Sequence, residues 1–299
     1  MMAPCPYCGT VGPDASDGVL SCPGCGAPLD VKREMTASGW LQLPPSRDLA
    51  RIQCGNSSLQ LEGNIVPVAD FALSPGDGVY FPHQELLWKE PGTEIGTMTM
   101  KGAWKRVFAG LPIRMLWAAG PGRIAFSRDA PGEILAIPVA AGNAVDVREH
   151  VFVCATTNTT YDYFSTGVWF ETRNGDETET HYPVGWLMDR FSAPQRPGLV
   201  LIHAHGDAFV RVLAAGETLL LKPAALLYKD PSVQMMLHVE SPHAAGGGFA
   251  AFFTRLAAPR SLLLRLVGPG RVAMQSAYSH FHDPHGQMIR SSPGTVKQW

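Results

Sequence analysis

The chain repeats the segment Ser74-Pro-Gly-Asp-Gly-Val-Tyr-Phe-Pro-His-Gln-Glu-Leu-Leu-Trp-Lys-Glu-Pro91, and this repetition predicts its architecture. A second copy, Ala215-Gly-Glu-Thr-Leu-Leu-Leu-Lys-Pro-Ala-Ala-Leu-Leu-Tyr-Lys-Asp-Pro231, lies at an offset of 140, so that Gly216 corresponds to Gly76. A weaker copy, Ala141 to Cys154, lies at an offset of 66. Self-similarity at a fixed period is typical of proteins built from stacked or ring-like units.

A second motif supports this period. Gly120-Pro-Gly-Arg-Ile-Ala-Phe-Ser127 recurs as Gly268-Pro-Gly-Arg-Val-Ala-Met-Gln275, and each copy follows an apolar run. We therefore expect one β domain over residues 49–279, made of three repeats at about 49–110, 111–190 and 191–279.

Composition favours an all-β fold. The 31 glycines and 25 prolines fall at short intervals between Val, Ile, Leu and aromatic runs, a pattern that interrupts helices and suits short strands joined by turns. The predicted fold class is all-β, with three repeated short β-sandwich units. Asn174-Gly175, between two polar arms, predicts a hairpin with a type I′ turn, in which both central residues have positive φ.

The first thirty residues contain two Cys-x-x-Cys pairs, which predict a small zinc ribbon over residues 1–30. Two thiolates at this spacing lie on one tight turn, and two such turns facing each other form a tetrahedral site suited to Zn²⁺. No position is left open for a catalytic water, so the zinc would be structural. The predicted ligands are Cys5, Cys8, Cys22 and Cys25.

The segments on either side of the β domain are predicted to be irregular. Residues 31–48 contain Pro44-Pro45 and are expected to form a linker, although Trp40 and Leu41 could dock on the β domain. Residues 280–299 have few apolar side chains and are expected to form a flexible tail. We see neither a secretory signal nor a membrane-spanning run, which predicts a cytoplasmic protein.

The charge pattern argues against bulk attraction to nucleic acid or anionic membranes, because the formal net charge is −2. Residues 97–128 nevertheless carry six basic residues and no acidic one, whereas residues 171–179 are rich in acid. These segments could be solvated faces of opposite sign, a complementary subunit contact or, for the basic segment, a patch for an anionic ligand.

His203-Ala-His205 has strand spacing, so both imidazoles would leave one face of a sheet, as at the start of a cupin metal site. The further ligands that a cupin requires are missing, since position 209 is Phe. We therefore favour surface or hydrogen-bonded histidines over a metalloenzyme. Cys54 and Cys154 lack partners at metal spacing and are expected to be buried small hydrophobic residues.

Pro75-Gly-Asp-Gly-Val-Tyr-Phe81, Lys105-Arg-Val-Phe-Ala-Gly110 and the two Gly-Pro-Gly-Arg motifs together resemble the altered-inheritance-of-mitochondria family, number twenty-four in that series. The resemblance covers roughly residues 52–279. It implies a β fold similar to the tryptophan-attenuator (TRAP) protein, in which three short β-sandwich units per chain assemble as a trimer into a pseudo-ninefold ring. Mitochondrial relatives are linked to inner-membrane organisation, and the family supplies no catalytic residues.

Three functional hypotheses follow. The first is a non-enzymatic, ring-forming interaction protein whose zinc ribbon recruits an unidentified protein partner. The second is a cupin-like metalloenzyme that uses His203 and His205. The third is RNA binding by analogy with the attenuator protein, through Lys101, Lys105 and Arg106, although fold analogy alone is a weak argument and nucleic acid is not the expected partner.

Overall fold

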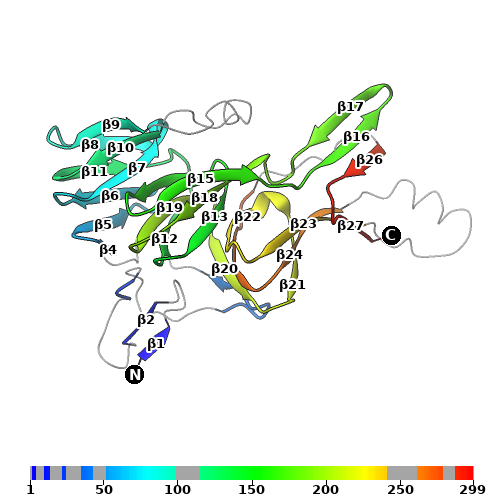
Figure 1. Ribbon diagram of the computed structural model, residues 1–299, viewed down its shortest axis with the longest axis horizontal. Coiled ribbons are helices and arrows are strands. Elements are labelled where there is room, and N and C mark those ends of the chain that lie inside the picture. Colours follow the sequence, from blue (N-terminus) through cyan, green and yellow to red (C-terminus); the bar gives the residue numbers. More distant parts are fainter. Residues whose placement is uncertain are drawn as a thin grey trace, which may run out of the picture.

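The computed structural model describes residues 2–4, 10–13, 22–24, 35–42, 52–98, 115–240, 261–278 and 287–298 (Figure 1). These residues form β-strands, their turns and two short 3-10 helices, η3 (His83–Glu85) and η4 (Pro223–Ala225). The prediction of an all-β fold is confirmed.

The element order of the central domain follows the two sequence offsets. We call the strands that begin with the quoted stretch the first unit: β6 (Val68–Leu73), β7 (Gly78–Pro82), β8 (Leu86–Lys89), β9 (Glu94–Met98), β10 (Met115–Ala119) and β11 (Gly122–Phe126). The third unit contains β20 (Ala208–Leu213), β21 (Thr218–Leu221), β22 (Leu226–Lys229), β23 (Gln234–Glu240), β24 (Ser261–Val267) and β25 (Gly270–Gln275). The middle unit contains β12 (Glu133–Val139), β13 (Ala144–Arg148), β14 (Phe152–Thr156), β15 (Thr160–Ser165), β18 (Leu187–Ser192) and β19 (Gly198–Ala204).

One turn explains why glycine recurs at both offsets. Gly76, Gly142 and Gly216 have φ angles of 84°, 80° and 77°, a region that L side chains rarely adopt. In each copy the amide of the following residue donates to the carbonyl three residues before it, in the pairs Asp77 to Ser74, Asn143 to Ala140 and Glu217 to Ala214. The same tight turn therefore leads into the second strand of each unit.

Each unit divides its strands between two sheets, and neighbouring units share sheets. The sheets have the strand orders β4-β5-β6-β11-β8, β12-β19-β14-β7-β10-β9, β15-β18-β13-β22-β25-β20-β3 and β21-β24-β23-β27. The strands of these four sheets that lie outside the units are β3 (Leu41–Gln42), β4 (Ile52–Cys54), β5 (Ser57–Glu62) and β27 (Val296–Gln298). The six-stranded sheet thus joins the middle and first units, and the seven-stranded sheet joins the third and middle units.

Three apolar cores separate these four sheets. The core with Phe71 and Phe81 lies between the five-stranded and six-stranded sheets. The core with Phe152 and Phe191 lies between the six-stranded and seven-stranded sheets, and the core with Leu264 lies between the seven-stranded and four-stranded sheets. Both faces of the two shared sheets are therefore buried, and this burial explains their long apolar runs.

The predicted linker is anchored to the β domain where the structure describes it. β3 pairs with β20, and the side chains of Trp40 and Leu41 are 8% and 6% exposed. Arg211 Nη1 also donates to the Ser38 carbonyl over 2.8 Å. The expectation of an irregular linker is thus wrong for residues 35–42, where the alternative that Trp40 and Leu41 dock on the β domain holds, because burial of the two apolar side chains offsets the entropy lost on ordering the segment. The remainder of 31–48 lies outside the described residues.

The prediction of a flexible tail is wrong for residues 287–298. β26 (Gln287–Ser291) pairs with β16 (Phe170–Asn174), and β27 runs parallel to β23. Strand addition depends on backbone hydrogen bonds, which a scarcity of apolar side chains does not reveal. The C-terminal segment covers the sides of two strands that belong to different sheets.

The predicted hairpin is confirmed, but its turn differs from the prediction. β16 pairs with β17 (Glu177–His181), and Asn174 lies opposite Glu177, so the two turn residues are Gly175 and Asp176. Gly175 has a φ of 61°, whereas neither Asn174 nor Asp176 has a positive φ. The type I′ assignment is therefore wrong. We call this hairpin the arm, and Figure 1 shows it projecting from the body beside β26.

Removing residues 287–299 should loosen the arm without unfolding the units, because the truncation opens one side of β16 and one side of β23. We expect amide hydrogen exchange in β16 to become at least about tenfold faster. Exchange in β6, which has strands on both sides, should not change and serves as the internal control. Unchanged exchange in β16 would contradict the assigned pairing.

Candidate functional site

The units of one chain meet at two strand junctions with the same geometry. β7 of the first unit pairs antiparallel with β14 of the middle unit, with Tyr80 opposite Ala155. β13 of the middle unit pairs antiparallel with β22 of the third unit, with Asp146 opposite Lys229. Tyr80 and Asp146 occupy the same position of their units, as do Ala155 and Lys229. Each unit therefore presents its second strand to the third strand of the next unit in a fixed register.

This rule leaves two strands without a partner on one side. β8 ends the five-stranded sheet and β21 ends the four-stranded sheet in the described part of the chain. Both carry exposed apolar side chains, since Leu87, Trp88 and Leu220 are 53%, 40% and 39% exposed. An open edge strand with exposed apolar side chains is a template for pairing with another chain. The two edges form the candidate functional site.

The junction between the middle and third units shows how such a contact is held. Asp146 is fully buried and accepts hydrogen bonds from Lys229 Nζ over 2.9 Å and from Arg190 Nε over 2.6 Å. Arg148 Nη1 donates to the Ala224 carbonyl over 2.7 Å, and burial lowers the pKa of this guanidinium. Backbone pairing at this junction is thus joined by charge-assisted hydrogen bonds that favour one register.

Glu85 lies in η3, directly before the open strand β8, and is 3% exposed. Its Oε1 accepts from Arg128 Nη1 over 3.3 Å, whereas its Oε2 is buried without a hydrogen-bond partner. Burial raises the pKa of this carboxyl to about 7, and the charge of Arg128 only partly opposes the shift. The open strand β8 therefore begins beside a buried carboxyl group that has one oxygen hydrogen-bonded and the other without a partner.

The two histidines of the cupin hypothesis do not form a metal site with the described residues. His203 is 1% exposed and its Nε2 lies 3.1 Å from the Ala130 carbonyl, which fits a neutral ring that donates from Nε2. Its ring centroid lies 5.0 Å from that of His205. No group of three or more potential metal ligands occurs in the described part of the chain. Burial lowers the pKa of His203 to about 4.

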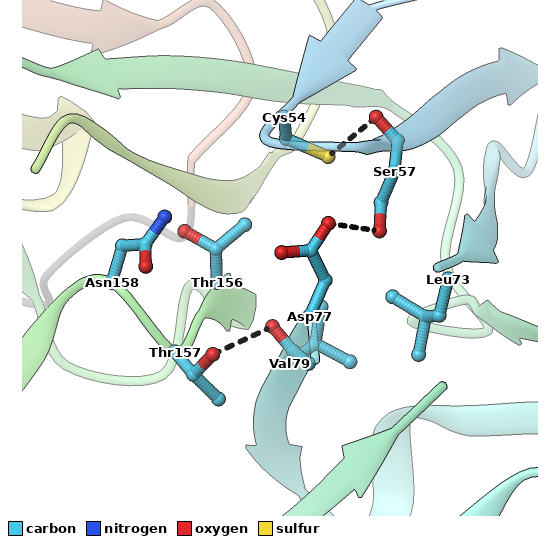
Figure 2. Close-up of a pocket in the computed structure, with 9 residues that line it drawn as sticks. Cys54, Ser57, Leu73, Asp77, Val79, Thr156, Thr157 and Asn158 are labelled. Carbon is cyan, nitrogen blue, oxygen red and sulfur yellow. Dashed lines mark hydrogen bonds between the residues drawn. The ribbon is translucent and has the colours of Figure 1, made fainter. Parts of the chain in front are cut away.

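A small pocket lies where the turn before β7 meets the turn after β14 (Figure 2). Asp77 accepts hydrogen bonds there from Ser57 Oγ over 2.8 Å and from the Asn56 amide over 2.9 Å. Burial raises the pKa of the neighbouring Cys54 thiol to about 11, and the charge of Asp77 adds to the shift. The thiol is therefore protonated at neutral pH, and the hydrogen bonds to Asp77 hold the turn.

Most of the other predicted site residues lie outside the described residues, namely Cys5, Cys8, Cys25, Lys101, Lys105 and Arg106. Cys22 is described and buried, and its Sγ accepts from the Gly24 amide over 3.3 Å. The turn at residues 22–24 packs on residues 10–12, because a Cβ on Gly24 would lie 2.2 Å from Thr10 Oγ1.

Comparison with known proteins identifies the family of the β domain. Residues 59–277 match the family model described as mitochondrial biogenesis AIM24. The chain belongs to the AIM24 family. No curated protein matches it. The crystal structure of protein SPYM3_0169 from Streptococcus pyogenes is similar, with a TM-score of 0.51 and 14% identity, over 75% of this chain and 94% of that one. Because the two sequences share so few residues, this similarity shows only that the two proteins have a similar fold.

The AIM24 match begins at β5 and ends after β25, so it includes both open edges. The sequence analysis identified β8 and β21 as parts of a repeat but not as edges, because edge positions depend on which strands pair. A sequence signal that could have identified these edge strands is the presence of apolar side chains, such as Leu87 and Leu220, at positions that no other part of the chain buries. Among the described residues no helix has the length and apolar character needed to cross a bilayer.

Neutral, buried His203 predicts a specific pH dependence of stability. Its pKa is 6.5 ordinarily and about 4 in the fold, so the unfolded chain takes up this proton first as the pH falls. The contribution of neutral His203 to the free energy of unfolding is therefore fully present above pH 6.5. Up to about 3 kcal/mol of it is lost as the pH falls from 6.5 to 4. We expect the free energy of unfolding, measured by urea titration at pH 7 and 4.5, to fall more steeply for the native chain than for His203→Gln. Parallel pH profiles of the two proteins would contradict the neutral assignment.

Proposed function

We propose that this AIM24-family protein is a non-enzymatic scaffold in which three chains close a ring by pairing β21 of one chain with β8 of the next. A zinc ribbon on each chain would recruit a protein partner. The number of chains follows from the resemblance to the attenuator fold. The support for closure is the recurrence of one junction geometry inside the chain, which leaves a matching strand at each end.

The sheet composition supports closure more strongly than the exposed apolar side chains do. The six-stranded sheet combines β7, β10 and β9 of the first unit with β14, β19 and β12 of the middle unit, and the seven-stranded sheet combines the corresponding strands of the next two units. The five-stranded and four-stranded sheets remain as the two halves of a third combined sheet. Joining them between chains applies the same rule once more and leaves no half-sheet in the ring.

The internal junctions also fix the register of the proposed contact. Lys89 occupies the position of Lys229, and Leu220 occupies the position of Asp146, so Lys89 should lie opposite Leu220 of the neighbouring chain. Trp88 should then lie opposite Leu221, as Tyr228 lies opposite Val147. Tyr228 is 3% exposed and belongs to the core between the six-stranded and seven-stranded sheets. Trp88, 40% exposed in the single chain, would be buried in the same way.

The zinc ribbon rests on its cysteine spacing and on the geometry of its described residues. β1 (Met2–Pro4) and β2 (Val11–Pro13) pair antiparallel across the first Cys-x-x-Cys. Gly24, within the second Cys-x-x-Cys, lies against Thr10, which is two residues after the first pair in the sequence, and this contact is compatible with a ribbon. Bound Zn²⁺ would supply folding free energy to a module too short to have its own core.

Several features support a scaffold over the two alternatives. The buried His203, with its lowered pKa, and the protonated Cys54 provide no catalytic set within the described ranges. RNA binding would depend on residues outside them. We propose the cytoplasm as the compartment. The family description refers to mitochondrial biogenesis.

Charged substitutions at the open edges should prevent ring formation. Leu220→Lys would place a second cation opposite Lys89 of the neighbouring chain, and Trp88→Glu would place a carboxylate opposite the apolar Leu221 in the proposed interface. We expect native mass spectrometry to show a trimer for the native chain and monomers for both variants. Val212→Glu is the matched control, since Val212 is 69% exposed on β20, which has strands on both sides, and this variant should stay trimeric. A native chain that is monomeric at all concentrations would overturn the proposed assembly.

Zinc content and assembly should be separable. Elemental analysis of the native chain should give one zinc per chain, and Cys22→Ser should lose it because three thiolates bind zinc far more weakly than four. The trimer should persist in this variant and after treatment with a chelator. Partner capture, by contrast, should be lost in both cases. Cys154→Ser is the control, since this buried thiol lies in the core of the β domain and should leave the zinc content unchanged.

A further inference from the structure

We propose that Leu220 of one protomer packs on Leu86 of the next, so that ring closure extends the apolar core of the neighbour's first unit. The inference rests on the proposed ring and identifies a side-chain contact across its interface. Leu220 lies on β21 and is 39% exposed, and Leu86 is the first residue of β8 and is partly buried. Each of these strands has an open side in the described part of the chain.

A register shift in the third strand of every unit determines which of its side chains share a face. In β8 the pairs on either side of this shift are Leu86 with Phe126 and Lys89 with Ile124. Residues two apart on a regular strand point to the same face, as Phe126 and Ile124 do on β11. Leu86 and Lys89 therefore share a face although they are three residues apart. The same shift occurs in β14 and in β22.

The junction between the first and middle units shows how a side chain of the preceding unit uses this face. Tyr80 of the first unit lies opposite Ala155 of β14. The ring of Tyr80 also contacts the ring of Phe152, three residues before Ala155, with 6.0 Å between the two centroids. The Tyr80 hydroxyl lies 2.8 Å from the hydroxyl of Thr159, in the turn after β14. The side chain at this position thus packs directly on residues of the next unit.

The same geometry would place Leu220 on Leu86. Leu220 occupies the position of Tyr80 in its unit, and β8 corresponds to β14. The register of the internal junctions places Leu220 opposite Lys89 of the neighbouring protomer. Leu220 would then reach along β8 to Leu86, in the manner of Tyr80 on β14. The contact follows from a register and a strand irregularity that the chain already uses internally.

The burial of Leu86 differs from that of its counterparts in a way that fits a missing neighbour. Phe152 and Leu226 occupy its position in the other two units and are 5% and 0% exposed, whereas Leu86 is only partly buried. Leu86 already packs on the core that contains Phe126. An apolar side chain laid over it would remove the remaining exposed surface of Leu86, and part of that of Leu220, from water.

The lysine opposite Leu220 does not oppose this contact. Its counterpart Lys229 donates across the internal junction to Asp146 over 2.9 Å, and the position of Asp146 is taken by Leu220 in β21. Lys89 Nζ instead donates to the Thr93 carbonyl over 3.0 Å, in the turn that follows β8. Lys89 therefore has an acceptor within its own protomer and need not be buried without one. The closing junction would be apolar where the junction between the middle and third units is charged.

The test compares ring dissociation among variants of the full-length protein by native mass spectrometry over a dilution series. Leu220→Ala should raise the concentration at which half of the ring dissociates at least about tenfold, because it removes most of the buried contact. Leu220→Met, which nearly conserves the side-chain volume, should stay within about threefold of the native chain. Ile65→Ala is the matched control, since Ile65 is 69% exposed in the turn between β5 and β6, and it should have no effect.

A double-mutant cycle identifies Leu86 as the partner of Leu220. Leu86→Ala should weaken the ring, and adding Leu220→Ala should then weaken it no more than about twofold further, because the contact has already been lost. Additive effects of the two substitutions would overturn the assigned contact and leave the ring intact. A stable native ring with an unaffected Leu220→Ala variant would overturn it as well. A native chain that is monomeric at all concentrations would remove the proposed function and this inference together.

Cross-linking keeps the inference testable if circular dichroism shows that Leu86→Ala does not fold. A short bismaleimide applied to the double variant Leu86→Cys and Leu220→Cys should link protomers covalently, because the two side chains would be in contact across the interface. Each single cysteine variant serves as a control for the native thiols. Linkage no greater in the double variant than in the single variants would overturn the assigned contact.

Discussion

The structure depends on one constraint, which is that no unit can satisfy the hydrogen bonds of its own strands. The second and third strands of a unit lie in different sheets, and each completes its pairing only with a strand of an adjacent unit. A backbone amide or carbonyl left unpaired in a buried sheet costs about as much as a lost hydrogen bond. Each internal junction therefore completes one strand from each of two units, and in the described part of the chain β8 and β21 are left with one open side.

The chain treats its internal junctions and its ends differently at the level of side chains. The junction between the first and middle units pairs Tyr80 with Ala155, and the next one pairs Asp146 with Lys229 in a buried ion pair. The first junction also contains a buried hydrogen bond between the Tyr80 and Thr159 hydroxyls, over 2.8 Å, so a neutral polar contact holds one junction and charged groups hold the other. The charged junction thus contributes specificity within the chain. The open strands β8 and β21 instead carry exposed apolar side chains, namely Leu87, Trp88 and Leu220.

The sequence was sufficient for the parts of the fold that are local. Gly76, Gly142 and Gly216 mark a turn that requires a positive φ, so their spacing predicted where the strands begin. Pairing between distant strands was not accessible in this way. The docking of residues 35–42 on β20, the addition of β26 to β16 and the open side of β8 all depend on which edges remain after the sheets have formed. The half-paired Glu85 could not be predicted because its burial is a property of those sheets.

The repeat also determines where the chain carries its additional segments. The arm lies between β15 and β18, and the corresponding connections are those between β9 and β10 and between β23 and β24, which are likewise long. In the first and middle units this connection follows the edge strands β9 and β15, and in the third unit it follows β23, which has only β27 beyond it, so no other unit pairs at this side. Insertions at that point leave the junctions untouched, since the second and third strands form the junctions. A protein assembled from such units can therefore vary its surface along one rim while the contacts that would close a ring remain unchanged.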